Sequence, residues 1–351
     1  MYMVATAALQ DGMQVGEDVV VGGNVIVKKG KIIDRLTVKQ LEACRVIGIN
    51  ILEPSDNAKT WYEKVRLSRE FKTFEDDYRT NLFAFKAACD NFVQNKVPFS
   101  KLDLLSIANR MVPDGMSGKL LFAYLYLHLP DSDDLSYAHG LNVAMICKVV
   151  SRWLGLSPAD TDILIQCGFL YDVGKLLLPH EIIWKPDRLN KMELDLVRCH
   201  PFLGYHTLSK YVQVDQNVLA ATLQHHERSD GSGYPQGLTA DQINPFARII
   251  AILDVYEAMT SARSYRQPMC PYQVIRIFQE ESFQKYDIMF INTFLKHIVD
   301  ELIGNHVRLN NGWEGEVIMN NTQDLSRPIL KSDAEIIDMT KRRELAIVQI
   351  I

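Results

Sequence analysis

The sequence has 351 residues, a length that predicts two or three domains at about 150 residues each. Apolar residues make up 47% and charged residues 23%, a balance typical of a globular protein with a hydrophobic core, which excludes disorder along the whole chain. The formal net charge of −5 excludes a strongly basic nucleic-acid binder, while a local basic pocket for a small phosphate ligand stays compatible with it.

The cysteines and the apolar runs predict a cytoplasmic protein. None of the six cysteines forms a Cys-x-x-Cys pair, and several lie in apolar stretches, as buried free thiols in a reducing cytosol do. Residues 1–13 lack the basic start and the long apolar run of a secretory signal. We expect no membrane span, because no apolar run approaches the ~18 residues that one needs.

The sequence pattern over residues 1–55 predicts a small α+β module. The β-branched runs on either side of Gly22 and Gly23 are typical of a hairpin, here over 19–27. A capping-box pattern that begins at Thr37 then opens a short helix, which we expect to continue over 41–47.

Residues 58–95 contain no glycine or proline and predict one long helix. Aromatic residues recur on it every seven positions, at Phe71, Tyr78, Phe85 and Phe92. Such a narrow apolar stripe must be buried. Either it packs against the chain's own helices or it forms the seam of a homodimer, and the sequence leaves both open.

Helical periodicity dominates from residue 98 to residue 304, and proline, glycine and aspartate mark the breaks. We expect helices over 101–112, 117–128, 137–154, 159–178, 191–211, 215–226, 241–262, 271–282 and 287–303. We group 58–130 as connecting helices and 131–304 as the main helical domain. The Asn311-Gly312 pair between two apolar runs predicts a hairpin, so we expect 305–351 to be a small β-rich appendage. The predicted fold is therefore mainly α, with small β parts at both ends.

Histidine and aspartate are the residues that suggest chemistry. The candidate metal ligands are His139, Asp172, His200, His225, His226 and Asp254, each in an apolar helical stretch near a helix end. A carboxylate such as Asp254 is costly to bury unless something compensates its charge, and a metal ion does so. Imidazole and carboxylate together suit iron, manganese or zinc. The remaining histidines are interpreted as structural: His128, His180, His206, His297 and His306.

The order of these residues is more specific than any one of them. Along the chain they read His, Asp-x-x-Lys, His-Pro, His-His-Glu-Arg, Gly-Tyr-Pro and finally Asp. The segment 225–235 is a near-complete match to the signature of the HD-GYP family, a branch of the HD metal-dependent phosphohydrolases. The chain resembles that family over residues 130–285.

The resemblance implies a helical catalytic domain that hydrolyses the bacterial second messenger cyclic di-GMP with two divalent metal ions, most often iron or manganese, with zinc also suitable. Two metals suit phosphodiester hydrolysis because they supply hydroxide at neutral pH and relieve charge on the phosphoryl oxygens. Asp172 is suited to bridging them, and Lys175 to contacting the scissile phosphate, so we assign catalytic roles to both. A third metal is disfavoured, because Leu135 stands where some members have a glutamate.

Substrate-binding residues follow from the same resemblance. They are Lys175, Lys185, Arg228, Gly231, Gly233, Tyr234, Pro235, Arg263 and Arg266. Arg263 and Arg266 are three residues apart, a spacing that places both on one helix face to grip a phosphate or the Hoogsteen edge of guanine.

One position departs from the family. Tyr171 replaces the histidine of the His-Asp pair, so the first metal site keeps only His139, Asp172 and Asp254. The second site keeps its full set of four ligands. Tyr171 is open to three interpretations: a phenolate ligand, a weak first site that fills only at high metal concentration, or a degenerate and inactive enzyme.

We therefore expect a cytoplasmic bacterial cyclic di-GMP phosphodiesterase whose activity Tyr171 reduces. The alternative is a catalytically degenerate HD-GYP protein that acts as a cyclic di-GMP receptor or a signalling scaffold. The expected partners are cyclic di-GMP or a related cyclic dinucleotide, no large nucleic acid, and a second copy of the chain through the 58–95 helix.

Overall fold

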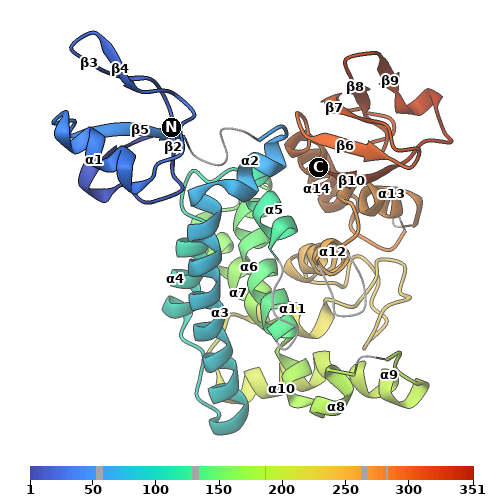
Figure 1. Ribbon diagram of the computed structural model, residues 1–351. Coiled ribbons are helices and arrows are strands. Elements are labelled where there is room, and N and C mark those ends of the chain that lie inside the picture. Colours follow the sequence, from blue (N-terminus) through green and yellow to red (C-terminus); the bar gives the residue numbers. More distant parts are fainter. Residues whose placement is uncertain (53–57, 129–133, 186, 262–267, 282–283) are drawn as a thin grey trace. The chain divides into compact units, whose positions relative to one another are not determined.

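The structure is a computed structural model that describes residues 1–351 except 53–57, 129–133, 186, 262–267 and 282–283 (Figure 1). The chain divides into two compact units, Met1–Thr73 with Ile351, and Phe74–Ile350. The finer division into 1–55, 58–130, 131–304 and 305–351 stays a prediction. Helices dominate and the sheets are small, which confirms the predicted mainly α fold. No helix among the described residues is both long enough and apolar enough to cross a membrane.

The first unit is a small α+β structure. Its elements are β1 (Tyr2–Ala5), η1 (Thr6–Ala8), β2 (Gln14–Val15), β3 (Val19–Val21), β4 (Asn24–Val27), α1 (Arg35–Ala43), β5 (Gly48–Leu52) and α2 (Trp61–Leu67). Strand β5 pairs antiparallel with both β1 and β2, while β3 and β4 form the predicted hairpin. The core of this sheet is made of small and medium apolar side chains, including Val15, Ile33, Leu41, Ile49 and Ile51.

Two predicted helices in this region have different bounds. Helix α1 begins earlier than expected, because the Asp34 carboxylate accepts the Thr37 N–H at 2.7 Å and caps the helix upstream. The single helix predicted over 58–95 is wrong at Ser68, whose backbone is extended at φ −71° and ψ 153°. The Ser68 hydroxyl accepts the Phe71 N–H at 3.1 Å and so starts a new helix, α3 (Arg69–Asn95).

The aromatic stripe of α3 is buried within the chain. The exposed fractions of Tyr78, Phe85 and Phe92 are 1%, 3% and 0%. The Phe85 ring lies 4.9 Å from that of Phe169, a residue of helix α7 (Pro158–Leu170). The stripe thus packs against the chain's own helices, the first of the two alternatives. The homodimer predicted through the 58–95 helix stays a prediction.

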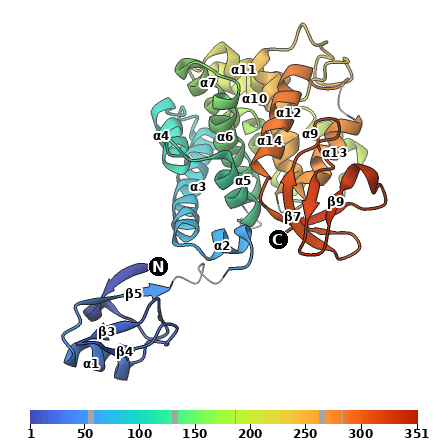
Figure 2. The same ribbon diagram turned by 90° about the horizontal axis from the view of Figure 1, so that it is seen from above.

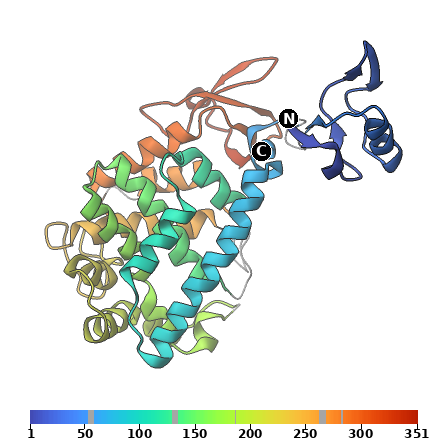
Figure 3. The ribbon, with the colours of Figure 1, turned by 90° about the vertical axis from the view of Figure 1, so that its left-hand side faces the viewer.

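The second unit is a helical bundle followed by a sheet. Its further helices are α4 (Lys101–Met111), α5 (Gly118–Leu127), α6 (Leu135–Trp153), α7, η4 (Val173–Leu177), α8 (His180–Ile183), α9 (Lys191–Val197), α10 (His200–Tyr211), α11 (Gln216–Gln224), α12 (Pro245–Thr260), α13 (Pro271–Glu281) and α14 (Ile288–Glu301). Helix α6 is central, and every residue from Tyr137 to Ser151 is buried. Figure 2 shows α6 between α3 and α12, and in Figure 3 α3 crosses the face nearest the viewer.

Two more predicted helices are interrupted, and both breaks position residues of interest. The helix predicted over 159–178 ends at Leu170, and a 3-10 turn, η4, follows. Gly174 in η4 lies so close to α10 that a Cβ there would be 1.9 Å from the His200 carbonyl oxygen. The helix predicted over 191–211 breaks before His200, where Pro201 occupies the first turn of α10. These breaks bring η4 and the start of α10 together.

The C-terminal segment forms a five-stranded antiparallel sheet in the order β10-β6-β7-β8-β9. Its elements are β6 (His306–Leu309), β7 (Glu314–Met319), β8 (Ile329–Lys331), β9 (Ile336–Asp338), η5 (Met339–Lys341) and β10 (Ile347–Ile350). The predicted hairpin is β6 and β7, and Gly312 takes the positive φ of 85° that its turn requires.

Candidate metal centre

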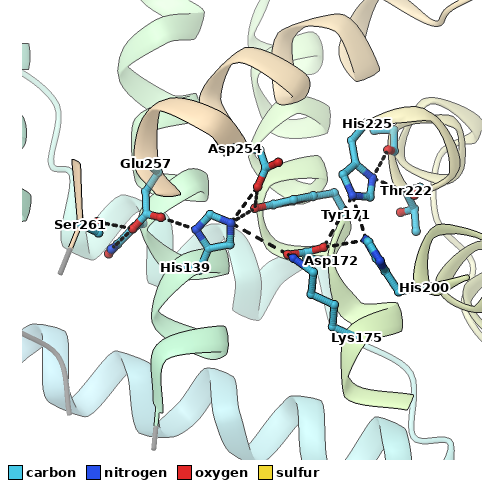
Figure 4. A network of polar contacts seen from close by, with 12 residues as sticks. His139, Tyr171, Asp172, Lys175, His200, Thr222, His225, Asp254, Glu257 and Ser261 are labelled. Atoms are coloured by element: carbon cyan, nitrogen blue, oxygen red, sulfur yellow. Dashed lines mark hydrogen bonds and ion pairs between the residues drawn. The ribbon is translucent and has the colours of Figure 1, made fainter. Parts of the chain in front are cut away.

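The six predicted metal ligands come together from five segments. Figure 4 shows five of them, together with Tyr171 and Lys175. His139 comes from α6, Asp172 from the α7–η4 junction, His200 from the start of α10, His225 and His226 from the end of α11, and Asp254 from α12. Two groups arise, which we call the imidazole cluster (Asp172, His200, His225 and His226) and the phenol cluster (Tyr171, His139 and Asp254, with Glu257 behind them).

The imidazole cluster has the shape of a cation site. Each member offers one ligand atom, and all four atoms lie within 4.8 Å of one another. Asp172 Oδ1 lies 3.1 Å from His200 Nε2 and 3.6 Å from His225 Nε2. The two Nε2 atoms are themselves 3.1 Å apart.

The backbone around the two rings fixes which nitrogen carries the proton. His200 Nδ1 lies 2.6 Å from the Val197 carbonyl, and His225 Nδ1 lies 3.0 Å from that of Thr222. A carbonyl only accepts, so each Nδ1 donates, and in the neutral rings both Nε2 atoms present lone pairs. Burial lowers the pKa of His200 and so favours its neutral form.

Asp172 completes a set of converging acceptors. Its Oδ1 is buried and receives no hydrogen bond from the described residues. Burial alone opposes ionisation, but the Lys175 ammonium at 2.5 Å from Oδ2, with the nearby imidazoles, holds the pKa of Asp172 well below its ordinary value. An ionised oxygen and two ring nitrogens that face one another without a shared proton suit a divalent metal ion.

The phenol cluster is different, because its acceptors are already engaged. The Tyr171 hydroxyl lies 2.6 Å from His139 Nε2 and donates to Asp254 Oδ1 at 3.1 Å. His139 Nε2 is also 2.8 Å from Asp254 Oδ1. Burial, then the charges of Asp254 and Asp172, raise the pKa of Tyr171 well above its ordinary value, so Tyr171 is a neutral phenol in this environment. His139, Asp172 and Asp254 still offer three ligand atoms within 4.8 Å of one another.

Glu257 supports the phenol cluster, and sequence reasoning missed it. Its Oε2 contacts His139 Nδ1, and its Oε1 accepts from Asn142 Nδ2 and from the Ser261 hydroxyl, both at 2.6 Å. The sequence feature that could have pointed to Glu257 is its position three residues after Asp254, since that spacing places both acids on one helix face.

The signature segment forms a tight loop beside the imidazole cluster. The buried Glu227 carboxylate accepts the backbone N–H of Gln236 at 2.6 Å and that of Leu238 at 2.9 Å. A Cβ on Gly233 would lie 2.4 Å from the backbone nitrogen of Arg228, so only glycine fits there. The Tyr234 ring stacks on His226, with the ring centroids 4.7 Å apart. Gly231 and Pro235 lie in the same loop.

The predicted substrate-binding cations have varied surroundings. Arg228 Nη1 donates to the carbonyls of His225 and Glu227 at 3.1 and 2.8 Å, so this arginine holds the loop. Lys185 pairs with Glu193 at 2.8 Å. Arg263 and Arg266 lie outside the described residues. Sequence reasoning missed Arg198, whose guanidinium lies 5.6 Å from the centroid of the Tyr234 ring.

Comparison with known proteins identifies the helical region. A sequence profile of the HD domain family matches residues 125–289. The chain is 35% identical over 205 residues to a cyclic di-GMP phosphodiesterase of Pseudomonas aeruginosa, which covers 58% of this chain and 49% of that protein. It is 38% identical over 126 residues to the cyclic di-GMP phosphodiesterase response regulator RpfG of Xanthomonas campestris, covering 35% of this chain and 32% of that protein.

The chain is also similar to a cGAMP phosphodiesterase and to one solved structure. The chain is 36% identical over 169 residues to 3'3'-cGAMP-specific phosphodiesterase 1 of Vibrio cholerae, covering 48% of this chain and 39% of that protein. It thus spans half or less of the length of these relatives. The HDG"Y"P protein Bd1817 from Bdellovibrio bacteriovorus aligns with a TM-score of 0.49 and 18% identity, covering 83% of this chain and 97% of that one. Residues 125–289 thus match the HD domain family, and the relatives named cyclic di-GMP phosphodiesterases support the resemblance to its HD-GYP branch, with Tyr171 in place of the histidine of the His-Asp pair.

Proposed function

We propose that this protein is a metal-dependent phosphodiesterase that hydrolyses the cyclic dinucleotide cyclic di-GMP. The observation that carries the proposal is the imidazole cluster, where Asp172 Oδ1 and the His200 and His225 Nε2 atoms converge as unprotonated acceptors. The names of the relatives, cyclic di-GMP and cGAMP phosphodiesterases, support the substrate class.

Asp172, His200, His225 and His226 would hold the metal, which we propose to be iron, manganese or zinc. When bound, such an ion lowers the pKa of a coordinated water and relieves charge on the phosphoryl oxygens. Lys175 holds Asp172 Oδ2, which leaves Oδ1 facing the histidines. Its ammonium therefore lies beside the cluster, where a point charge favours an anionic phosphate.

The phenol cluster leads us to propose that the first metal site is closed or weak. The Tyr171 hydroxyl already contacts His139 Nε2 and Asp254 Oδ1, the atoms that a metal would take. The neutral phenol is a poor ligand, so a metal must remove the Tyr171 proton or displace the side chain. We expect hydrolysis slower than that of a two-metal enzyme.

The same observation favours a second candidate function. A protein with an incomplete metal pair can bind cyclic di-GMP without cleaving it, and so act as a receptor. The residues that we propose for substrate binding are Lys175, Gly231, Gly233, Tyr234, Pro235, Arg263 and Arg266, together with Lys185 and Arg228 in supporting positions.

The test measures turnover and binding of cyclic di-GMP and cGAMP by the full chain, with added manganese or iron. His200→Ala removes one cluster ligand, and His206→Ala, on the same helix, is the matched control. Turnover that is lost only in His200→Ala supports the phosphodiesterase. Binding without turnover supports the receptor, and the absence of both contradicts the proposal.

A further inference from the structure

Arg198 lies at the end of α9, two residues before His200, and its guanidinium is open to ligands. Its side chain is 54% exposed. Among the residues that the structure describes, its ion-pair partner is Asp195, with 3.9 Å between Nη1 and Oδ1. A long and exposed pair of this kind contributes little, so the N–H groups of Arg198 stay available.

Arg198 is linked to the imidazole cluster through the ring of Tyr234. Its guanidinium lies 5.6 Å from the Tyr234 centroid, and Tyr234 stacks on His226 at 4.7 Å with an interplanar angle of 27°. The contact of a cation with a ring uses the π face and leaves the N–H edges free. Arg198 therefore adjoins the cluster from outside, separated from it by Tyr234.

Arg228, on the same loop as Tyr234, differs from Arg198 in the contacts of its guanidinium. Its Nη1 is bonded to two backbone carbonyls, and its guanidinium lies 5.0 Å from the Tyr286 ring. Arg228 therefore stabilises the loop, while no short contact from the part of the chain that the structure describes occupies the donors of Arg198.

We propose that Arg198 recognises a guanine base of the bound dinucleotide, an inference that rests on the proposed function. The reacting phosphate belongs at the metal ligands, and the ring of Tyr234 separates Arg198 from them, so Arg198 meets a more remote part of the ligand. Tyr234 is half-buried and has His226 and the Arg198 guanidinium against its ring, so it holds Arg198 at the edge of the cluster. The guanidinium fork matches the O6 and N7 acceptors of guanine, whereas adenine places an amino donor at the position of O6.

The experiment measures binding of cyclic di-GMP and cyclic di-AMP by calorimetry on the full chain. In Arg198→Ala, the preference for the guanine ligand should fall by about tenfold to a hundredfold, the discrimination that one bidentate contact to a base supplies. Arg198→Lys keeps the charge without the fork and should not restore the preference. Lys210→Ala is the control, because it removes a cation from the far end of α10 and should leave both affinities unchanged.

The outcomes separate this inference from the function on which it rests. Equal weakening of both nucleotides in Arg198→Ala, with rescue by lysine, means that Arg198 contacts a phosphate and overturns base recognition. Unchanged binding also overturns it. If the parent binds neither nucleotide, the proposed function itself fails and takes the inference with it.

Discussion

The imidazole cluster and the phenol cluster both contact Asp172, yet the hydrogen-bonding groups of the two clusters are satisfied in opposite ways. In the imidazole cluster two Nε2 lone pairs and one buried carboxylate oxygen converge with no proton between them. In the phenol cluster a hydroxyl donates to Asp254 and contacts His139. One side chain, Tyr171, makes the difference, so the capacity to bind metal depends on hydrogen-bond satisfaction as much as on which ligands are present.

The largest expected effect comes from breaking each cluster in turn. His225→Ala should abolish metal binding and lower turnover by at least about a hundredfold, because loss of the metal removes several kcal/mol of transition-state stabilisation. His139→Ala should leave the metal content of the imidazole cluster unchanged. Metal quantification and hydrolysis assays on both variants check this, and equal loss of metal from both would contradict the asymmetry between the clusters.

Converting the phenol cluster into a metal site is the second test. Tyr171→His restores the missing imidazole, so metal content should rise and turnover should increase by about a hundredfold, at 1.36 kcal/mol per factor of ten. Tyr171→Phe, which removes the hydroxyl but adds no ligand, is the control and should gain less metal than Tyr171→His. If the parent hydrolyses cyclic di-GMP quickly and Tyr171→His slows that hydrolysis, the Tyr171 phenol is itself a metal ligand.

A third change tests how η4 is held against α10. Gly174→Ala places a Cβ 1.9 Å from the His200 carbonyl oxygen, and such overpacking should lower the free energy of unfolding by about 1–3 kcal/mol. Metal affinity should also fall, since the variant separates Asp172 from His200. Gly140→Ala meets its nearest neighbours at 3.4 Å and is the control. Denaturant unfolding of both variants measures the difference, and equal stabilities would sink this account of the η4–α10 contact.

The smallest effect concerns pH in metal-free protein. Burial lowers the pKa of His200 and, together with His225, that of His226, so the folded state takes up these protons less readily than the unfolded state. Stability is therefore complete above the unfolded pKa of about 6.5 and falls as pH drops below it, by up to about 1.4 kcal/mol per pH unit for each group. His226→Gln should reduce this acid dependence when unfolding is measured from pH 7.5 to 5.5 with a chelator. If the stability of His226→Gln fell more steeply with decreasing pH than that of the parent, the lowered pKa of His226 would be refuted.

Much of the candidate centre could be predicted from the sequence, because the order of its ligands is local motif information. The hairpins at 19–27 and after Gly304 also follow from local turn chemistry. The break at Ser68 could not be foreseen, since helical periodicity continues through it and only a side-chain cap interrupts the helix. The same limit applies to the helix predicted over 159–178, because the close approach of Gly174 to α10 is a tertiary contact.

The contacts of the arginine side chains near the site could not be predicted from the sequence either. The substrate-binding role of Arg228 stays a prediction, and the sequence did not show that its Nη1 bonds to the carbonyls of His225 and Glu227. Arg198 carried no motif, and its place beside Tyr234 depends on how α9 and the signature loop meet. Sequence patterns identify residue types that suit a chemistry, while tertiary packing decides which of them keep free donors.

The number of metal ions bound per chain tests the central claim most directly. Protein purified without chelators and analysed by elemental mass spectrometry should contain one iron, manganese or zinc ion per chain, and His225→Ala should contain none. Two tightly bound ions in the parent would contradict the closure of the first site by Tyr171, and a parent without metal would contradict the imidazole cluster as a metal site.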